Sequence, residues 1–268
     1  MGILNLTEDS FYDGGSYLSN ENILHRAKQI LDEGGTIIDL GAVSTRPGAA
    51  DVPEEVENER IVHATQLIRQ QYPHATISID TWRASVARNA ILAGADIIND
   101  VSGGTFDPQM ANTIGELQVP YVLMHTTAKP DLMQQQTLGE NPLTEILHFF
   151  GNQIDLFKKA GCKDIILDPG FGFGKTVEQN YFLMENLQAL QIFELPILVG
   201  ISRKSMIYKV LETNPDNALN GTTILHTIAL QKGASILRAH DVKEAVETVT
   251  ICQKLAQSSV YGKVASGR

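Results

Sequence analysis

Short apolar runs recur along this chain, and each one stops at polar residues. There are eight such runs, rich in Ile, Val and Leu. They cover residues 2–6, 36–41, 75–80, 95–100, 120–125, 164–169, 196–202 and 235–241. Continuous apolar runs, rather than alternating ones, are typical of parallel strands that are covered on both faces. The pattern therefore predicts an α/β fold built on parallel strands.

The segments between these runs have the apolar spacing of amphipathic helices. They cover residues 20–34, 53–72, 83–94, 107–118, 142–161, 176–191, 217–233 and 241–257. Repeated strand–helix units can close into a (β/α)8 barrel of the TIM type, and an open doubly wound sheet is the alternative. The regularity of the eight units favours the closed barrel. Since no linker or change of composition interrupts them, we expect one domain over residues 1–268.

Two of the strand-to-helix loops are long and polar, and Gly or Pro residues interrupt them. They cover residues 7–19 after the first strand and 42–53 after the second. TIM barrels carry their active sites at the carboxyl ends of the strands, where these loops begin. We therefore expect both loops to act as lids or binding segments.

Charge and cysteine usage limit the possible partners and compartment. The net charge of −10 makes the chain a poor partner for nucleic acid or an anionic membrane. No window approaches the ~18 apolar residues of a membrane span, and the amino-terminal residues do not resemble a signal peptide. Two distant cysteines, Cys162 and Cys252, indicate a reducing compartment without disulfides. We expect a cytoplasmic protein.

Three of the predicted strands end in a carboxylate or an amide. These side chains are Asp80, Asn99 and Asp168. A buried polar group needs a partner, and a flat heterocycle with ring N–H groups and an exocyclic amine would provide one. Capping of the following helix is the alternative for Asp80 alone. Together the three predict a recess for a planar polar ligand.

Cationic side chains gather after the seventh strand and in the eighth. Arg203 and Lys204 follow the seventh strand, while Arg238 and His240 lie two positions apart and therefore share a side. Barrels often hold phosphate at these two loops. A solvated residue at a helix start is the alternative for Arg203 or Lys204 singly. Because cations are unfavourable at a helix amino terminus, two of them indicate a nearby anion.

Other polar residues give weaker indications. Asn5, with His240, could ligate a hard cation that escorts a diphosphate. The segment GFGFGKT at 170–176 fits neither the phosphate-loop nor the dinucleotide pattern, and predicts a tight turn. For His125, a hydrogen-bonded core position is favoured over a role as a base. A Schiff base on Lys204, as in an aldolase, is a distant alternative.

The ordered set of motifs resembles the dihydropteroate synthases. The matching segments are GILNLTEDSFYDGG, DLGAVSTRPGA, SIDT, ADIINDVSGG, LDPGFGFGKT, LVGISRKS and LRAHD. The resemblance covers nearly the whole chain, and the ordered set is far more specific than any single piece. It implies condensation of 6-hydroxymethyl-7,8-dihydropterin diphosphate with p-aminobenzoate, which gives 7,8-dihydropteroate and diphosphate for folate biosynthesis.

The resemblance also implies roles for individual residues. The pterin ring would be held by Asp80, Asn99, Asp168 and Lys204. Arg238 would pack on that ring and, with His240, hold the diphosphate, while Asn5 would bind Mg²⁺. The expected catalytic residues are Arg238, His240, Lys204 and Asp80.

The same resemblance implies a second-substrate site and a quaternary state. Thr45 and Arg46 would lie in the second loop near the diphosphate, and Pro47, Phe173 and Ser202 would help to form the p-aminobenzoate pocket. The family is usually homodimeric.

Two other functions fit part of the pattern. One is a methyltransferase that moves a methyl group from methyltetrahydrofolate to a corrinoid, and the other is a barrel that binds pterin without catalysis. The long loops and the cationic strand ends favour the synthase, because a methyl donor has no diphosphate to hold.

Overall fold

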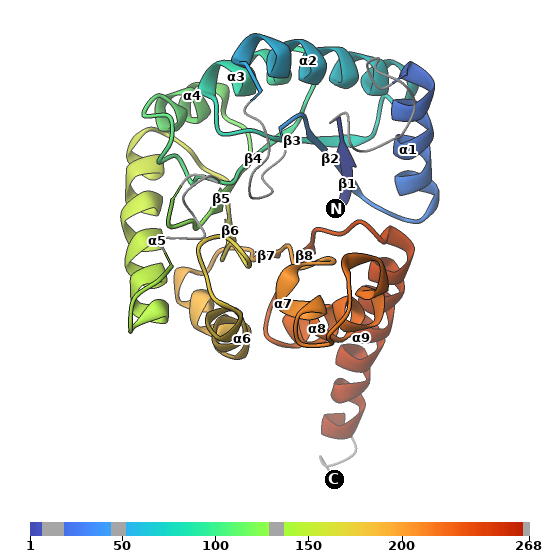
Figure 1. The fold of residues 1–268 in the computed structure, drawn as a ribbon, viewed down its shortest axis with the longest axis vertical. Coiled ribbons are helices and arrows are strands. Elements are labelled where there is room, and N and C mark those ends of the chain that lie inside the picture. Colours follow the sequence, from blue (N-terminus) through green and yellow to red (C-terminus); the bar gives the residue numbers. More distant parts are fainter. Residues whose placement is uncertain (7–18, 44–51, 129–136, 265–268) are drawn as a thin grey trace.

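Strands and helices alternate along the chain, and the helices surround the strands (Figure 1). The computed structural model describes residues 1–6, 19–43, 52–128 and 137–264, with side chains described as far as residue 258. The strands are β1 Gly2–Asn5, β2 Ile37–Gly41, β3 Thr76–Asp80, β4 Ile97–Asp100, β5 Tyr121–Met124, β6 Ile165–Asp168, β7 Leu198–Val199 and β8 Ile236–Leu237. The α-helices are α1 Asn20–Asp32, α2 Glu54–Gln71, α3 Ala84–Leu92, α4 Met110–Leu117, α5 Pro142–Lys159, α6 Val177–Glu185, α7 Ser205–Tyr208, α8 Leu219–Gln231 and α9 Val242–Val264.

The strands close into a barrel. Strands β1 to β6 form one parallel sheet in chain order, and β7 pairs with β8 in parallel. Isolated bridges join Leu167 to Ile197 and Gly2 to Ala239. The backbone N–H of Leu167 donates to the Pro196 carbonyl at 2.8 Å, and that of Ile3 donates to the Ala239 carbonyl at 3.0 Å. The predicted (β/α)8 barrel is confirmed.

The inside of the barrel has an apolar layer below a polar one. A small apolar cluster combines the buried side chains of Ile97, Val122 and Leu198 with the partly buried ones of Met1, Ile37, Ile166 and Ile236. Residues two apart on a strand face the same side. On four strands, the residue two positions after an isoleucine of this cluster therefore also faces inward, and it is polar. These residues are Asp39, Asn99, Asp168 and Arg238. The apolar layer fills the barrel and supports the polar one at the carboxyl ends of the strands.

Several helices differ from the predicted ranges; α9, for example, extends to Val264, beyond the predicted residue 257. Thr176 begins α6 through a capping box with Gln179, as a residue with a short hydroxyl side chain commonly does. Helix α6 ends before the predicted residue 191, because a 3₁₀ helix, Leu187–Phe193, replaces its last turns. The short helix α7 was not predicted, and Lys204 stands at its N-cap.

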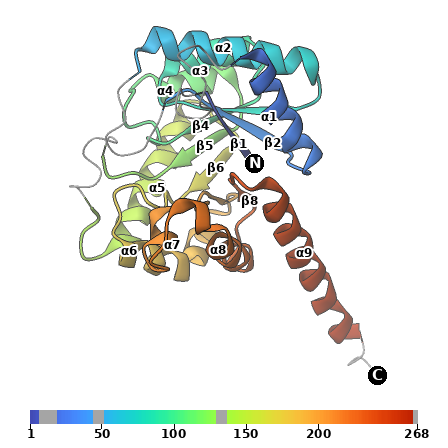
Figure 2. The same cartoon turned by 45° about the vertical axis from the view of Figure 1, so that its right-hand side comes forward.

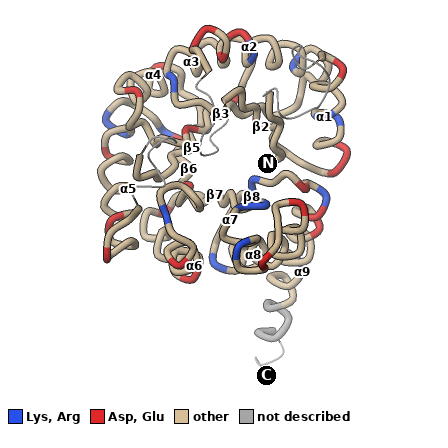
Figure 3. The backbone as a smooth tube through the Cα atoms, viewed as in Figure 1, with Lys and Arg blue, Asp and Glu red and all other residues tan. Residues whose placement is uncertain are grey.

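The outer surface is charged, and helix α9 extends away from the barrel (Figure 2). Lys and Arg alternate with Asp and Glu around the outer helices (Figure 3). Cys162 is buried and Cys252 is partly exposed, and both are free thiols. Within the described residues, no helix is long and apolar enough to cross a membrane.

Candidate functional site

Arg238 lies at the centre of the polar layer and joins two carboxylates. Its Nε donates to Asp39 Oδ2 at 2.6 Å, and its Nη2 donates to Asp80 Oδ2 at 2.8 Å. The side chain of Asp39 is fully buried, whereas that of Arg238 is 20% exposed. Although burial opposes the charge, the two carboxylates raise the pKa of Arg238 above its ordinary value. The guanidinium is thus a fixed cation at the mouth of the barrel.

Asp39 also orients the amide of Asn99. Its Oδ2 accepts from Asn99 Nδ2 at 3.2 Å, while its Oδ1 accepts from Ser78 Oγ at 2.7 Å. Because the Asn99 amino group is directed to Asp39, its carbonyl oxygen remains to accept from a ligand. The sequence assigned no role to Asp39. Its position two residues after Ile37, in the inward-facing set, is the signal that could have identified it.

Asp80 and Asp168 are carboxylates in a poorly solvated site. Burial raises the pKa of Asp80 to about 7, with a further contribution from Asp39, and Arg238 opposes the shift. Burial also raises the pKa of Asp168, whose Oδ1 accepts from the Gly170 N–H at 2.8 Å. The carboxyl group of Asp80 can therefore hold or accept a proton near neutral pH.

Lys204, the N-cap residue of α7, extends its side chain to the loop after β6. Its Nζ donates to the Phe171 carbonyl at 2.5 Å and lies 4.5 Å from the centroid of the Phe173 ring. Burial lowers the pKa of Lys204 to about 8, and Asp168 opposes the shift. Lys204, Phe173 and Asp168 therefore form one contiguous part of the site.

Ser202 and His240 join the loops after β7 and β8. The backbone N–H of His240 donates to Ser202 Oγ at 3.1 Å, and His240 Nδ1 lies 3.1 Å from the same oxygen. Burial lowers the pKa of His240 to about 4, and the charge of Arg238 adds to this effect. His240 is therefore neutral at physiological pH.

Arg203, which the sequence grouped with Lys204, has a different environment. Its backbone adopts a left-handed conformation with φ +55°. Its Nε and Nη2 donate to the two oxygens of Asp241 at 2.9 and 2.7 Å. This bidentate ion pair satisfies a carboxylate of the protein itself. Of the two cations, only Lys204 contacts the strand-end site.

Asn5 is the candidate metal ligand, and the described residues around it supply no metal cluster. Asn5 ends β1 and lies opposite Gly41 of β2. Nearby, Arg26 connects β1 to the end of the barrel after β8, because its side chain donates to the carbonyls of both Ile3 and His240. Among the described residues, no group of three or more His, Cys, Asp or Glu side chains is arranged to hold a metal ion. A single carboxamide oxygen fits a magnesium ion that takes its remaining ligands from water and substrate phosphates.

The remaining candidates are three residues of the second loop and His125. Thr45, Arg46 and Pro47 lie outside the described residues. His125 is a buried, hydrogen-bonded histidine, as the sequence favoured, with Lys175 Nζ 3.0 Å from its Nδ1.

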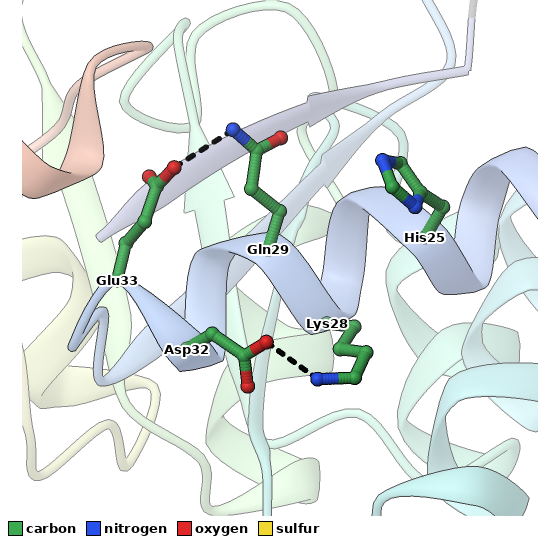
Figure 4. A pocket seen from close by; sticks show the side chains of 5 residues that line it. All are labelled: His25, Lys28, Gln29, Asp32 and Glu33. Carbon is green, nitrogen blue, oxygen red and sulfur yellow. Dashed lines mark hydrogen bonds and ion pairs between the residues drawn. The ribbon is translucent and has the colours of Figure 1, made fainter.

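A hollow of about 260 Å³ lies along the outer surface of α1 (Figure 4). Its lining residues are His25, Lys28, Gln29, Asp32 and Glu33. Their contacts include the pairs Lys28–Asp32 and Gln29–Glu33, which are ordinary pairs four residues apart on one helix. The hollow therefore shares no residue with the strand-end site.

The sequence and the fold have close counterparts among known proteins. A family model described as pterin binding enzyme matches residues 1–240, so the class is that of the pterin-binding enzymes. A dihydropteroate synthase of Synechocystis sp. is 43% identical over 258 residues, which cover 95% of this chain and 89% of that protein. The chain therefore belongs to the dihydropteroate synthase family.

Solved structures agree with this membership. The dihydropteroate synthase of Yersinia pestis, determined with a sulfonamide drug complex, superposes with a TM-score of 0.90 at 39% identity and covers 96% of this chain and 93% of its own. That of Xanthomonas albilineans, determined with 4-aminobenzoic acid, has a TM-score of 0.88 at 34% identity, with 95% and 92% covered.

Proposed function

We propose that this protein condenses 6-hydroxymethyl-7,8-dihydropterin diphosphate with p-aminobenzoate and releases diphosphate. Family membership over nearly the whole chain supports the reaction. The observation that carries the proposal is the polar layer itself, in which Arg238 and Lys204 lie among the buried Asp39 and Asp168 and the partly buried Asp80. A ring with N–H edges and an anionic substituent complements such a mixture of charges.

The pterin ring occupies the recess formed by Asp80, Asn99 and Asp168. The two carboxylates accept from ring N–H and exocyclic amino groups, while the free carbonyl oxygen of Asn99 accepts a further hydrogen bond. Lys204 donates to a ring acceptor. Asp80 then exchanges its contact with Arg238 for donors on the ring, which frees Arg238 to pack on the ring face.

The diphosphate lies at the end formed by Arg238, His240 and Asn5. A guanidinium offers several planar donors to phosphoryl oxygens. Neutral His240 donates one N–H without adding charge. A magnesium ion at Asn5 would neutralise part of the diphosphate charge when bound.

The second substrate approaches from the side of Phe173 and Ser202. The Phe173 ring offers an apolar surface to the benzene ring of p-aminobenzoate, and Lys204 at the start of α7 lies beside that ring. The Ser202 hydroxyl, held near His240, lies shortly before α7 in the chain. The family resemblance adds Thr45, Arg46 and Pro47 of the second loop, which lie outside the described residues, to this proposal.

The reaction is a dissociative substitution. The bond between the pterin methylene and the diphosphate oxygen breaks first, and its electron pair leaves with the diphosphate. The lone pair of the p-aminobenzoate nitrogen then forms the new carbon–nitrogen bond, and that nitrogen releases a proton. The residues of the site stabilise the leaving group, orient the amine and exclude water, and no covalent intermediate with the protein is needed.

Diphosphate release in a coupled assay tests the proposal. The purified protein, supplied with the pterin diphosphate and Mg²⁺, is expected to release diphosphate only after p-aminobenzoate is added. Release without p-aminobenzoate, or pterin binding in calorimetry without any turnover, contradicts it. Methyl transfer from methyltetrahydrofolate to a corrinoid would instead identify the methyltransferase.

We further propose that residues 1–268 act as a single barrel domain in the cytoplasm and that the protein is a homodimer. Exposed apolar side chains on α8 and α9 support a dimer, since Ile224, Ile251 and Leu255 are each more than half exposed. Light scattering that gives the mass of a monomer would contradict it.

A further inference from the structure

Lys175 is a buried cation to which the proposed reaction assigns no task. It is 8% exposed and directly follows the glycine-rich loop, residues 170–174, between β6 and α6. Burial lowers the pKa of Lys175 to about 7, while Asp168 opposes the shift. A charge in such a place is expensive unless the surroundings hold it firmly.

The ammonium group lies within hydrogen-bond distance of four acceptors. Its Nζ donates to the Gly170 carbonyl at 2.8 Å and to the Phe173 carbonyl at 2.9 Å, and lies 3.0 Å from His125 Nδ1 and 3.4 Å from the His125 carbonyl oxygen. An ammonium has three protons, so the three shorter contacts can use all of its donors. Burial, together with the charge of Lys175, lowers the pKa of His125 to about 2, so its ring is neutral and its Nδ1 can accept.

The loop depends on Lys175 because two backbone carbonyls of the loop converge on the ammonium group. Gly170 has φ +68°, and a side chain there would place Cβ 1.9 Å from the His125 carbonyl oxygen. The loop therefore lies directly against the end of β5. Without the ammonium, the buried carbonyls of Gly170 and Phe173 would lose a shared partner, which costs free energy.

The same loop contains one of the proposed substrate-binding residues, Phe173, and contacts two others. The N–H of Gly170 donates to Asp168, the carbonyl of Phe171 accepts from Lys204, and the ring of Phe173 lies beneath the Lys204 ammonium. Any displacement of the loop therefore moves the boundary between the ring recess and the p-aminobenzoate side. Small displacements at a reacting centre have large kinetic effects.

We infer that Lys175 is a positioning residue, which fixes the loop 170–174 through His125 so that Phe173, beside Lys204, can receive the second substrate. It touches neither substrate. The kinetic part of this inference rests on the proposed function, whereas the structural part does not.

The test compares K175M with K232M. Lys232 is a matched control, because its Nζ also donates to a backbone carbonyl, that of Glu185, at 2.7 Å, but outside the site. K175M is expected to raise the KM for p-aminobenzoate by about tenfold, which corresponds to one charge-assisted hydrogen bond. The KM for the pterin diphosphate should rise by a smaller factor than that for p-aminobenzoate, because Asp80 and Asn99 are held by the separate network around Asp39, and only Asp168 and Lys204 of the ring-binding residues contact the loop. K232M should change neither constant.

Amide hydrogen exchange in the ligand-free protein tests the structural part independently of activity. K175M should accelerate exchange of the loop amides, including that of Phe173, and leave α2 unchanged, and K232M should do neither. If K175M does not fold, K175Q retains side-chain donors and should show a smaller change in the same direction. Unchanged loop exchange, or an unchanged KM for p-aminobenzoate in an active protein, overturns the inference. An inactive wild type with the expected exchange pattern would overturn only the proposed function.

Discussion

Replacement of Asp39 by asparagine is the sharpest test of the buried polar layer. Three donors converge on this carboxylate, namely Ser78 Oγ, Asn99 Nδ2 and Arg238 Nε. An asparagine of nearly the same shape removes the charge and places an amino group among these donors. Removing one partner of a buried ion pair costs roughly 3–5 kcal/mol. Because Asp80 still holds Arg238 at 2.8 Å, we expect the lower end, about 3 kcal/mol.

Urea unfolding at constant pH measures this cost by linear extrapolation. The matched control is D96N, which removes a carboxylate from the Asp96–Arg69 pair of equally short distance, 2.7 Å, in which the Asp96 side chain is 46% exposed. Exposed pairs contribute about 0–1 kcal/mol. For a fall of 3 kcal/mol in the free energy of unfolding, the melting temperature of D39N should drop by roughly 6–12 °C, at about 2–4 °C per kcal/mol.

The outcome that would refute this reasoning is a loss below about 1 kcal/mol in D39N, equal to that in D96N, with an unchanged urea slope. In that case the contacts around Asp39 would not be stronger than those of a surface pair. A large loss of stability with an unchanged KM for the pterin diphosphate would support the contribution of the ion pair to stability. It would contradict the role of Asp39 in orienting Asn99.

Four further outcomes are expected. R238A should lower turnover by about a hundredfold or more, because it removes a donor for the leaving group, and turnover within about threefold of the wild type would contradict its assignment. Chelation of divalent metal should abolish diphosphate release, and added Mg²⁺ should restore it; release that is insensitive to the chelator argues against a metal at Asn5. Burial lowers the pKa of His226 from 6.5 to about 4. Between these two pH values the unfolded chain binds a proton that the folded chain does not, so the free energy of unfolding falls as pH falls. H226Q should reduce this slope by up to about 1.4 kcal/mol per pH unit in urea titrations between pH 6.5 and 4, and an unchanged slope would show that His226 titrates normally. G174A places a Cβ 1.6 Å from Thr127 Oγ1 at φ +62°, so it should cost about 1–3 kcal/mol or more, and calorimetry showing an unchanged melting temperature would contradict the tightness of this turn.

Sequence patterns predicted the barrel and its functional face because both depend on local regularities. Runs of apolar residues give the strands, and the positions at which the runs stop give the carboxyl ends of the strands. Asn99, Asp168 and Arg238 lie in the inward-facing polar layer for this reason.

Individual pairings were not predictable, because they depend on reach across the barrel. Asp39 and Arg238 are 199 positions apart, and nothing in the sequence near either one indicates the other. The separation of Arg203 from Lys204 depends on one left-handed residue, which directs neighbouring side chains to different partners. The helix α7 has only four residues, too few for its periodicity to be recognised.

The closure of the barrel has a consequence for its mechanics. The six-stranded sheet carries Asp80, Asn99 and Asp168, whereas the two-stranded sheet is followed by the residues that would hold the diphosphate. Among the described residues, the backbone pairing between the two sheets consists of isolated bridges at Leu167–Ile197 and Gly2–Ala239, and Arg238 adds ion pairs to Asp39 and Asp80. A substrate that binds residues of both sheets connects them. Substrate binding should therefore reduce backbone motion on the side of the barrel opposite the bound molecule as well as beside it. The protein would then be stiffest during turnover, when its two parts share one ligand.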